Sequence, residues 1–266
     1  MPVNDELGKR IKENYEERAK TKLVRRMPVI IRIDGKSFHT FTKHFVKPFD
    51  KLLMKSMQET MKYLCENIQG CVLGYTQSDE ITLVLQDYKE LTTDAFFNYE
   101  VQKICSIAAS MATMKFNQYF SKEVEDLIND ADPVFHSSIY TKDYMKLLDI
   151  YDIAAKKGAM FDARCFNVPK EEVVNALIYR QVDCYRNAVN SVGQFYFGQK
   201  QLQKKSQQEV KDLLTSKDII FDEFDFVKRF GISCVKDAQS HHWQYIELIF
   251  KEPDIRVMID NLIFYK

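Results

Sequence analysis

Short apolar runs alternate with helical stretches along the first two thirds of the chain, and this order constrains the fold more than any other feature. Apolar residues recur at helical spacing between Pro48 and Gly70, and again on a helix predicted from about residue 94. Three further runs are rich in β-branched residues and are predicted to be strands: VIIRID at 29–34, CVLGYT at 71–76 and ITLVL at 81–85. The order β-α-β-β-α lacks only the last strand of a ferredoxin-like βαββαβ unit, and Met160–Val168 is the candidate for it.

The remaining segments are assigned to helices or left open. Residues 5–24 are predicted to form a polar helix, and 121–159 an insertion of undetermined structure. A long helix is predicted from Pro169 to about 203, continuing through 204–214, followed by mixed short elements. Its expected buried stripe is Val174, Ile178, Val182, Tyr185, Val189 and Val192. We expect an α+β fold with a palm-like antiparallel sheet flanked by helices in 1–168, and a C-terminal helical and mixed region in 169–266.

Composition excludes several classes of protein. The 266 residues contain 38 Lys+Arg and 38 Asp+Glu, which excludes a uniformly basic nucleic-acid coat. No run of about 18 apolar residues is present, and the first twenty residues lack the apolar core of a secretory signal. We therefore expect a cytoplasmic protein without a membrane partner. Its 6 cysteines, with no C-x-x-C pair, are expected to be reduced thiols.

The zero net charge conceals two basic regions. Residues 1–48 carry 12 Lys/Arg against 6 Asp/Glu, and residues 180–211 carry 6 against 2. Two basic regions on a neutral chain indicate an anionic partner that touches limited surfaces. An ordinary solvated helix face would give the same composition.

Carboxylates are expected at one edge of the predicted sheet. In a βαββαβ unit the third strand lies between the first two, so the end of the first strand lies beside the tip of the hairpin. Asp34 ends the first strand, and Asp79 with Glu80 lies in a tip predicted over 77–80. Neighbouring strands are about 4.8 Å apart, so these carboxylates could share one or two divalent cations. Oxygen ligands favour Mg²⁺, although a plain turn and a solvated tip are the ordinary alternatives.

The loop after Asp34 offers groups that suit phosphate. Gly35 permits close backbone approach, and the following N–H groups, a cation and an imidazole can face phosphate oxygens. Phe38 could stack on a purine or belong to the core. Lys47 and Lys103 are further candidate phosphate contacts, with a solvated lysine as the alternative in each case. The candidate nucleotide contacts are Lys36, Ser37, Phe38, His39, Lys47, Ser78 and Lys103.

The predicted long helix carries a second polar cluster. Arg180, Asp183 and Asn187 are spaced to share one face, and Arg186 lies nearby. Arginine matches phosphate bidentately, so these residues are candidates for binding RNA or its 5′ end. An exposed helix with internal salt bridges is the alternative.

Several of these segments resemble one family. The segments RIDGKSFHTF at 32–41, KPFD at 47–50, TQSDEITLVL at 76–85, FDARCFNVP at 161–169 and RQVDCYRNAVNS at 180–191 are similar to motifs of the tRNA(His) guanylyltransferase superfamily. They occur in the family's order over about 32–192. The resemblance implies a polymerase-like palm that adds nucleotides in the 3′→5′ direction to the 5′ end of a tRNA.

The resemblance also implies roles for individual residues. Asp34 and Asp79 fall on the two metal-binding aspartates, the Gly35 carbonyl on a further ligand, and Glu80 on an acidic neighbour. His39, Lys47, Lys103 and Ser78 fall on positions that hold the nucleotide triphosphate. The implied cofactors are two Mg²⁺ ions, with ATP and GTP as substrates, and the implied assembly is a homotetramer.

Two departures point to one branch of the family. The long helix reads Tyr185-Arg186-Asn187-Ala188-Val189-Asn190 where the eukaryotic pattern reads HINNLYN, and Glu100 stands near a eukaryotic arginine. Both departures resemble the bacterial and archaeal guanylyltransferase-like proteins, which extend 5′-truncated tRNAs by templated addition. We therefore expect template-dependent 3′→5′ repair of tRNA, with guanylate addition to tRNA(His) as the alternative.

Two other functions use a similar sheet. A nucleotidyl cyclase also needs two carboxylates at this edge, but it makes a cyclic product without RNA. A non-enzymatic RNA-binding module would display aromatic residues on its central strands. The predicted first strand, VIIRID, has none, so this alternative ranks last.

Overall fold

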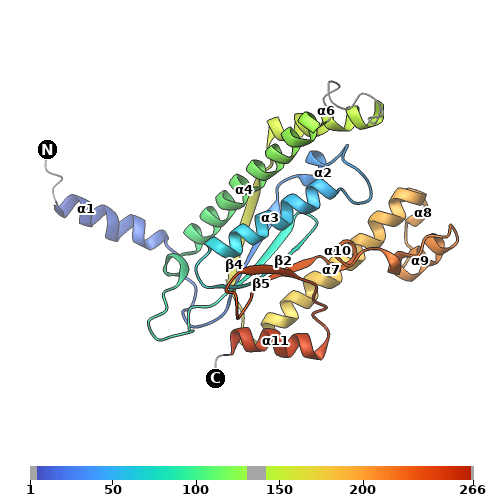
Figure 1. Cartoon of the computed structure of the whole chain (residues 1–266). Coiled ribbons are helices and arrows are strands. Elements are labelled where there is room, and N and C mark those ends of the chain that lie inside the picture. Colours follow the sequence, from blue (N-terminus) through green and yellow to red (C-terminus); the bar gives the residue numbers. More distant parts are fainter. Residues whose placement is uncertain (1–4, 131–141, 265–266) are drawn as a thin grey trace.

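A six-stranded antiparallel sheet in the order β4-β1-β3-β2-β5-β6 forms the centre of the protein. The computed structural model describes residues 5–130 and 142–264, so the central part of the expected 121–159 insertion lies outside the described residues. Helices cover both faces of the sheet (Figure 1). The α+β class and the strand order expected for the βαββαβ unit are confirmed. The strands are β1 (Val29–Gly35), β2 (Cys71–Gln77), β3 (Glu80–Leu85), β4 (Phe161–Asn167), β5 (Ile232–Lys236) and β6 (Trp243–Ile246).

The helices divide between the two faces and the two ends of the chain. The larger core packs α3, α4 and α6 against one face, and a second core packs α7 and α11 against the other. The N-terminal and central helices are α1 (Asp5–Ile11), α2 (Phe38–Phe41), α3 (Lys51–Asn67), α4 (Val101–Asp130) and α6 (Lys142–Lys157). The C-terminal helices are α7 (Val173–Phe197), α8 (Gln199–Leu202), α9 (Gln207–Thr215), α10 (Phe226–Phe230) and α11 (Pro253–Ile263). No helix within the described residues combines the length and apolar character needed to cross a bilayer.

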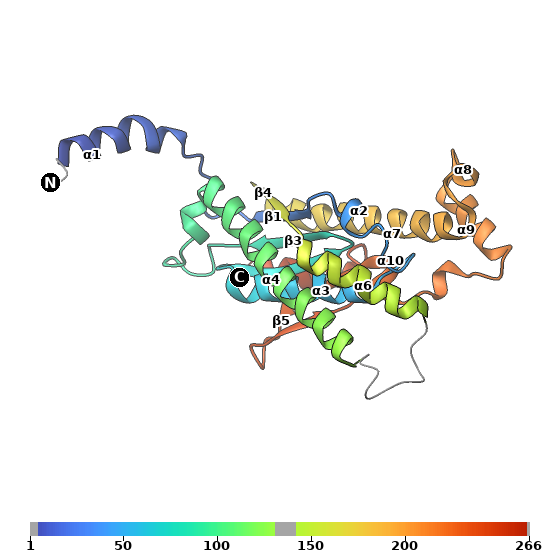
Figure 2. The ribbon, with the colours of Figure 1, turned by 90° about the horizontal axis from the view of Figure 1, so that it is seen from above.

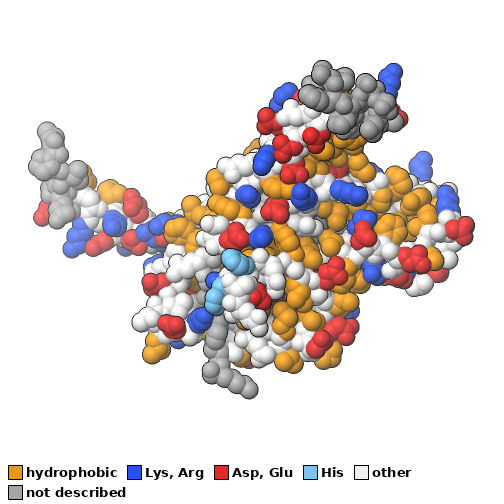
Figure 3. Space-filling model, viewed as in Figure 1, with side chains coloured by type: hydrophobic (Ala, Val, Ile, Leu, Met, Phe, Trp, Pro, Cys, Tyr) orange, Lys and Arg blue, Asp and Glu red, His pale blue; other side chains and the backbone are white. Residues whose placement is uncertain are grey.

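The N-terminal helical arm projects from the body of the protein (Figures 1 and 2), and the space-filling view shows Lys, Arg, Asp and Glu side chains mixed along it (Figure 3). Helix α1 continues through a π turn (Lys12–Glu16) and a 3-10 turn (Glu17–Ala19), so the helix predicted to reach residue 24 ends earlier. The backbone N–H of Leu23 then donates to the carbonyl of Tyr99, and Arg25 pairs with the buried carboxylate of Asp87. These contacts fix the chain where it enters β1.

Three consecutive left-handed residues delay the start of α4. Phe97, Asn98 and Tyr99 have φ angles of 48°, 51° and 56°, which a right-handed helix cannot contain. The helix therefore begins at Val101 and not at about residue 94. Phe97, which lies before the helix, is 42% exposed.

The long C-terminal helix is also shorter than predicted. Gly198, with φ 74°, ends α7, and Lys204, with φ 66°, separates α8 from α9. A capping box between Ser206 and Glu209 then starts α9 as an independent helix. The buried side of α7 runs through Leu177, Cys184 and Ala188, among others, whereas Val182 is 45% exposed. Three members of the predicted stripe, Val174, Val189 and Val192, are buried as expected, and the polar residues Arg180 and Gln181 are buried as well.

Asp50 joins three segments at the N-terminus of α3. Its carboxylate is 4% exposed and accepts from the backbone N–H of Leu53, which caps the helix. It also accepts from the Val46 N–H at 3.0 Å and from the Tyr151 hydroxyl of α6 at 2.5 Å. One buried side chain therefore holds the loop before α3 and helix α6 together.

We expect Asp50→Ala to lower the free energy of unfolding by about 2–4 kcal/mol, because it removes a helix cap and leaves buried donors without an acceptor. Urea denaturation measures this change. Asp149→Ala, on the exposed side of α6, is the control and should stay within about 0.5 kcal/mol of wild type. A similar small effect for both variants would contradict the joining role of Asp50.

Candidate active site

Asp34 and Asp79 meet at one edge of the sheet, as the topology predicts. Asp34 pairs with Glu80 in the β1–β3 register, and the Gly35 N–H donates to the carbonyl of Asp79 at 3.0 Å. Both aspartates line the same open pocket, whose volume of about 520 Å³ is within the range of ligand sites. The tip of the hairpin is shorter than predicted, because Gln77 pairs with Glu80 and leaves a two-residue turn.

The wall of this pocket is built by the loop that follows β1. Ser37 has a left-handed φ of 56° and turns the chain into α2, so that Ser37 and His39 line the pocket. A Cβ atom at Gly35 would lie 2.2 Å from the Phe38 ring, so glycine is required there by this ring. Phe38 also lines the pocket but is 3% exposed and packs on Phe116 and Phe161. Its expected stacking on a purine is corrected to a role in the core.

The two carboxylates are held close to other negative charges. Burial raises the pKa of the Asp34 carboxyl, and the neighbouring charges of Asp79, Glu80 and Asp162 raise it further. Burial also raises the pKa of Asp79, and the hydrogen bond from the Ser78 hydroxyl at 2.9 Å offsets this only in part. The folded protein therefore concentrates negative charge that it does not fully neutralise.

The oxygen atoms of this pocket suit Mg²⁺ better than a metal ion that takes all of its ligands from the protein. Within the described ranges, no group of three or more His, Cys, Asp or Glu side chains is placed to hold a metal ion. Mg²⁺ is commonly bound by one or two carboxylates together with waters and substrate phosphates. Asp34, Asp79 and the Gly35 carbonyl would supply such a partial set of oxygen ligands, because the two aspartates line one pocket together with Gly35.

The three candidate lysines lie in different places. Lys47 donates to the carbonyl of Thr42, which lines the pocket, so its ammonium group lies near the rim. Lys36 is exposed, and its backbone N–H donates to Met160 beside the pocket. Lys103 lies at the start of α4, level with the beginning of β1, and its nearest acidic partner is Glu100 at 3.9 Å. Lys103 does not line the carboxylate pocket, and its contact with nucleotide stays a prediction.

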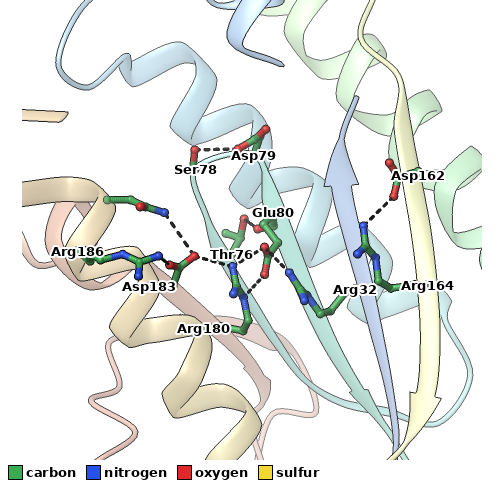
Figure 4. A network of polar contacts seen from close by, with 11 residues as sticks. Arg32, Thr76, Ser78, Asp79, Glu80, Asp162, Arg164, Arg180, Asp183 and Arg186 are labelled. Carbon is green, nitrogen blue, oxygen red and sulfur yellow. Dashed lines mark hydrogen bonds and ion pairs between the residues drawn. The ribbon is translucent and has the colours of Figure 1, made fainter. Parts of the chain in front are cut away.

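Glu80 is not among the residues that line the pocket, and it forms a buried ion pair. Its carboxylate is 6% exposed and receives two hydrogen bonds from Arg180, at 2.6 and 2.7 Å. Arg32 of β1 donates to it as well, at 2.9 Å. Figure 4 shows the two arginines reaching Glu80 from opposite sides, one from α7 and one from the sheet. Glu80 thus connects the hairpin to α7 and does not join Asp34 and Asp79 in the pocket.

The polar cluster on α7 extends from this ion pair. Asp183 accepts from Arg180 at 3.0 Å, from Asn187 at 3.4 Å and from Arg186. The shared face predicted for Arg180, Asp183 and Asn187 is therefore present. Arg180 is 7% exposed, so its expected contact with RNA is corrected to a buried structural role. Arg186, at 57% side-chain exposure, remains accessible to a ligand.

A second pocket adjoins the first through Leu53 and Ser78, which line both. It lies between the start of α3, the hairpin and α7, and Asn187 contributes to its wall. Asn187 is therefore the member of the α7 cluster that reaches the neighbourhood of the carboxylates.

Sequence reasoning missed three residues of this region. Arg32 forms an ion pair with Glu80, and Asp162 lies opposite Asp34 in the register of β1 and β4. Arg164 lies opposite Arg32, and its charge partly offsets the rise in the pKa of Asp34 that burial causes. In a strand over 161–167, alternate residues share a face, so Asp162, Arg164 and Phe166 lie on the same side. This alternation could have identified Asp162 and Arg164 from the sequence.

Comparison with known proteins identifies one family and several similar structures. Residues 8–169 match the family described as tRNAHis guanylyltransferase. The structure is similar to a bacterial tRNA(His) guanylyltransferase-like protein in complex with ATP, with 35% identity and a TM-score of 0.79 over 97% of this chain and 100% of that chain. A second such bacterial protein, in complex with GTP, has 31% identity and a TM-score of 0.73 over 98% and 100% of the two chains.

A curated relative matches over a shorter length. The probable tRNA(His) guanylyltransferase of Mus musculus is 27% identical over 203 residues, which are 74% of this chain. The match spans 58% of the length of the mouse protein.

We expect Arg180→Met to lower the free energy of unfolding by about 3–5 kcal/mol, because it leaves the buried Glu80 with too few partners. Arg186→Met removes an exposed arginine that pairs with Asp183 and should cost at most about 1 kcal/mol. Denaturant titration of both variants measures the difference, and adding Glu80→Gln to the first variant should recover part of the loss. Equal effects of the two substitutions would contradict the assignment.

A second expectation concerns the unneutralised carboxylates. Because folding raises the pKa of Asp34 and Asp79, their ionisation opposes folding at pH 7.5, and this effect disappears as the pH falls below the unfolded value of about 3.9. In EDTA, Asp34→Asn should therefore have a higher Tm than wild type at pH 7.5, and the gain should shrink towards pH 4. Added Mg²⁺ should raise the Tm of wild type more than that of the variant.

Thermal unfolding at several pH values checks this expectation. Asp149→Asn, at an exposed position on α6, is the control and should show no such pH-dependent gain. A lower Tm for Asp34→Asn than for wild type at pH 7.5 in EDTA would contradict it.

Proposed function

Because this chain belongs to the tRNAHis guanylyltransferase family, whose activity is 3′→5′ nucleotidyl addition to tRNA, we propose that it is a template-dependent enzyme that repairs 5′-truncated tRNAs. ATP and GTP are among its nucleotide substrates, and the 3′-OH of the incoming nucleotide attacks an activated 5′ end. The observation that carries the proposal is the shared pocket of Asp34 and Asp79. Two carboxylates from adjacent strand ends, beside a loop with free donors, suit nucleotidyl transfer.

Asp34, Asp79 and the Gly35 carbonyl are the residues that would hold two Mg²⁺ ions. When bound, these ions make a hydroxyl more acidic and neutralise the charge of phosphate oxygens. The chain itself supplies a fixed position for both carboxylates, because the β1–β3 pairing and the Gly35–Asp79 hydrogen bond set their separation. No movement of the backbone is needed to bring them together.

Residues around the carboxylates would bind the triphosphate. Ser37, His39 and Ser78 line the pocket and offer a hydroxyl or imidazole group to phosphate oxygens. Lys47, near the rim, and the exposed Lys36 add positive charge that would stabilise charge developing on those oxygens. These contacts would orient the nucleotide so that its 3′-OH faces the 5′ end of the tRNA.

The repair activity is supported by the likeness to the two bacterial proteins, which extends over nearly the whole of each chain. At the position of the eukaryotic arginine this chain has Glu100, which is 8% exposed, lies near Lys103 and pairs through its backbone with Lys22, so a buried carboxylate replaces that guanidinium group. The exposed N-terminal arm, whose charges are mixed, and the α7–α9 region would contact the body of the tRNA. A homotetramer would place several such surfaces around one substrate.

We expect Asp34→Ala and Asp79→Ala each to reduce 5′ nucleotide addition at least a hundredfold while the protein stays folded, because each removes a carboxylate from the shared pocket. The assay combines the protein, Mg²⁺, all four NTPs and a tRNA that lacks its first nucleotide, and growth of the 5′ end is followed on a sequencing gel. Asp149→Ala is the control and should keep wild-type activity.

The same assay separates the alternatives. Addition of the nucleotide complementary to the opposite template base supports repair, whereas addition of guanylate regardless of the template indicates a tRNA(His) guanylyltransferase. A cyclic nucleotide formed without RNA would indicate a cyclase, and RNA binding without any product a binding module. Full activity in either aspartate variant would refute the proposed role of the pocket.

A further inference from the structure

One face of the edge strand β4 is open to solvent and carries a row of three side chains. Asp162 and Arg164 have side-chain exposures of 59% and 56%, and Phe166 is 36% exposed. The alternate residues, Ala163 and Cys165, pack against the larger core on the other face. An exposed aromatic ring beside an exposed arginine on a strand is not needed for packing the sheet.

The row on β4 continues across β1 towards the carboxylate pocket. In the β1–β4 register, Asp162 lies opposite Asp34, Arg164 opposite Arg32, and Phe166 opposite Ile30. Side chains of opposite residues share a face of the sheet. Arg164 is therefore about 7 Å along the strand from the level of Asp34, and Phe166 about 7 Å beyond it.

Helix α7 borders this open face on its other side. Figure 4 shows α7 and β4 on opposite sides of the Arg32–Glu80–Arg180 contacts. The side of α7 that does not pack on the sheet exposes Tyr179 at 65% and Val182 at 45%. Aromatic and apolar side chains are thus exposed on α7 as well as on β4.

Arg164 is available to bind a ligand. Its ion pair with Asp162 is 3.4 Å long, and both side chains are more than half exposed, so this pair contributes little stability. Arg164 is not needed to neutralise a buried charge, unlike Arg180. A guanidinium group in this position matches a phosphate bidentately.

The combination of groups is chemically suited to single-stranded RNA. Aromatic side chains on open sheet faces stack on unpaired bases, and adjacent cations bind the backbone. An acidic peptide would use the arginine but would gain nothing specific from Phe166. The row also begins at the level of Asp34, where the proposed reaction requires the 5′ end of an RNA.

We propose that the open face of β4 is the binding site for the RNA 5′ end. Arg164 binds the terminal phosphate, and Phe166 stacks on the base of one of the terminal nucleotides. This assignment rests on the proposed function and adds the binding residues of its RNA substrate. Arg164 directs the terminal phosphate towards Asp34, and Phe166 keeps the unpaired end on the sheet. NTP binding in the carboxylate pocket does not involve either residue.

Binding of a truncated tRNA labelled at its 3′ end tests the assignment by fluorescence anisotropy, with 5′-phosphate and 5′-hydroxyl forms compared without NTP. Wild type should bind the 5′-phosphate form more tightly. Arg164→Ala should weaken binding of the 5′-phosphate form about tenfold and remove the preference between the two forms. It should also reduce, by about 1, the slope of the log binding constant against the log salt concentration. Arg164→Lys should keep part of the preference.

The ring is tested with a matched pair of substitutions. Phe166→Ala should weaken RNA binding by about fivefold or more, and Phe166→Tyr should retain it, because stacking requires only an aromatic face. Arg256→Ala, which removes an exposed arginine of α11, should bind both RNA forms as wild type does. ATP affinity, measured by calorimetry, should be unchanged in all variants, and Tm values confirm that each variant is folded.

Two results would overturn the assignment. If Arg164→Ala binds both RNA forms like Arg256→Ala while wild type extends the 5′ end, Arg164 only protects an edge strand from pairing, and the proposed function still stands. If wild type binds neither form of the RNA, the assignment and the proposed function both fail. An acidic peptide that displaces no RNA from wild type agrees with the assignment.

Discussion

The antiparallel pairing of β1 with β3 is the constraint on which the rest of the site depends. It places the last residues of β1 beside the two-residue turn of the β2–β3 hairpin, so that Asp34 and Asp79 line one pocket although 44 intervening residues separate them in sequence. A shift of one residue in this register would move Asp34 to the opposite face of the sheet. The Gly35–Asp79 backbone hydrogen bond fixes the same register at its last position.

Glu80 connects the strand register to the position of α7 through its ion pair with Arg180. Glu80 follows Asp79 directly in sequence, but its carboxylate is buried and accepts hydrogen bonds from Arg32 and Arg180. The helix that borders the site is thereby attached to the hairpin that carries a proposed catalytic carboxylate. Two adjacent acidic residues thus have opposite roles, because one faces an open pocket and the other is enclosed by arginines.

Negative charge is divided between groups that the fold neutralises and groups that it does not. Asp50, Asp87 and Glu80 are buried and receive hydrogen bonds or arginine partners. Asp34 and Asp79 remain underneutralised, and their raised pKa values record the resulting free-energy cost. A site that binds a cation and a triphosphate is expected to retain such a cost, because complete neutralisation within the protein would leave nothing for the ligands to gain.

The sequence by itself determined the strand order, the α+β class and the meeting of Asp34 with the hairpin tip, because strand periodicity and a short hairpin restrict the topology to few choices. It did not determine where α4 and the α7–α9 region break, since Phe97, Asn98, Tyr99 and Lys204 adopt left-handed conformations that no local pattern announces. Nor could it tell the buried Arg180 from the exposed Arg186. Only the tertiary structure decided which arginine faces Glu80, because burial depends on how α7 rotates against the sheet and not on residue type.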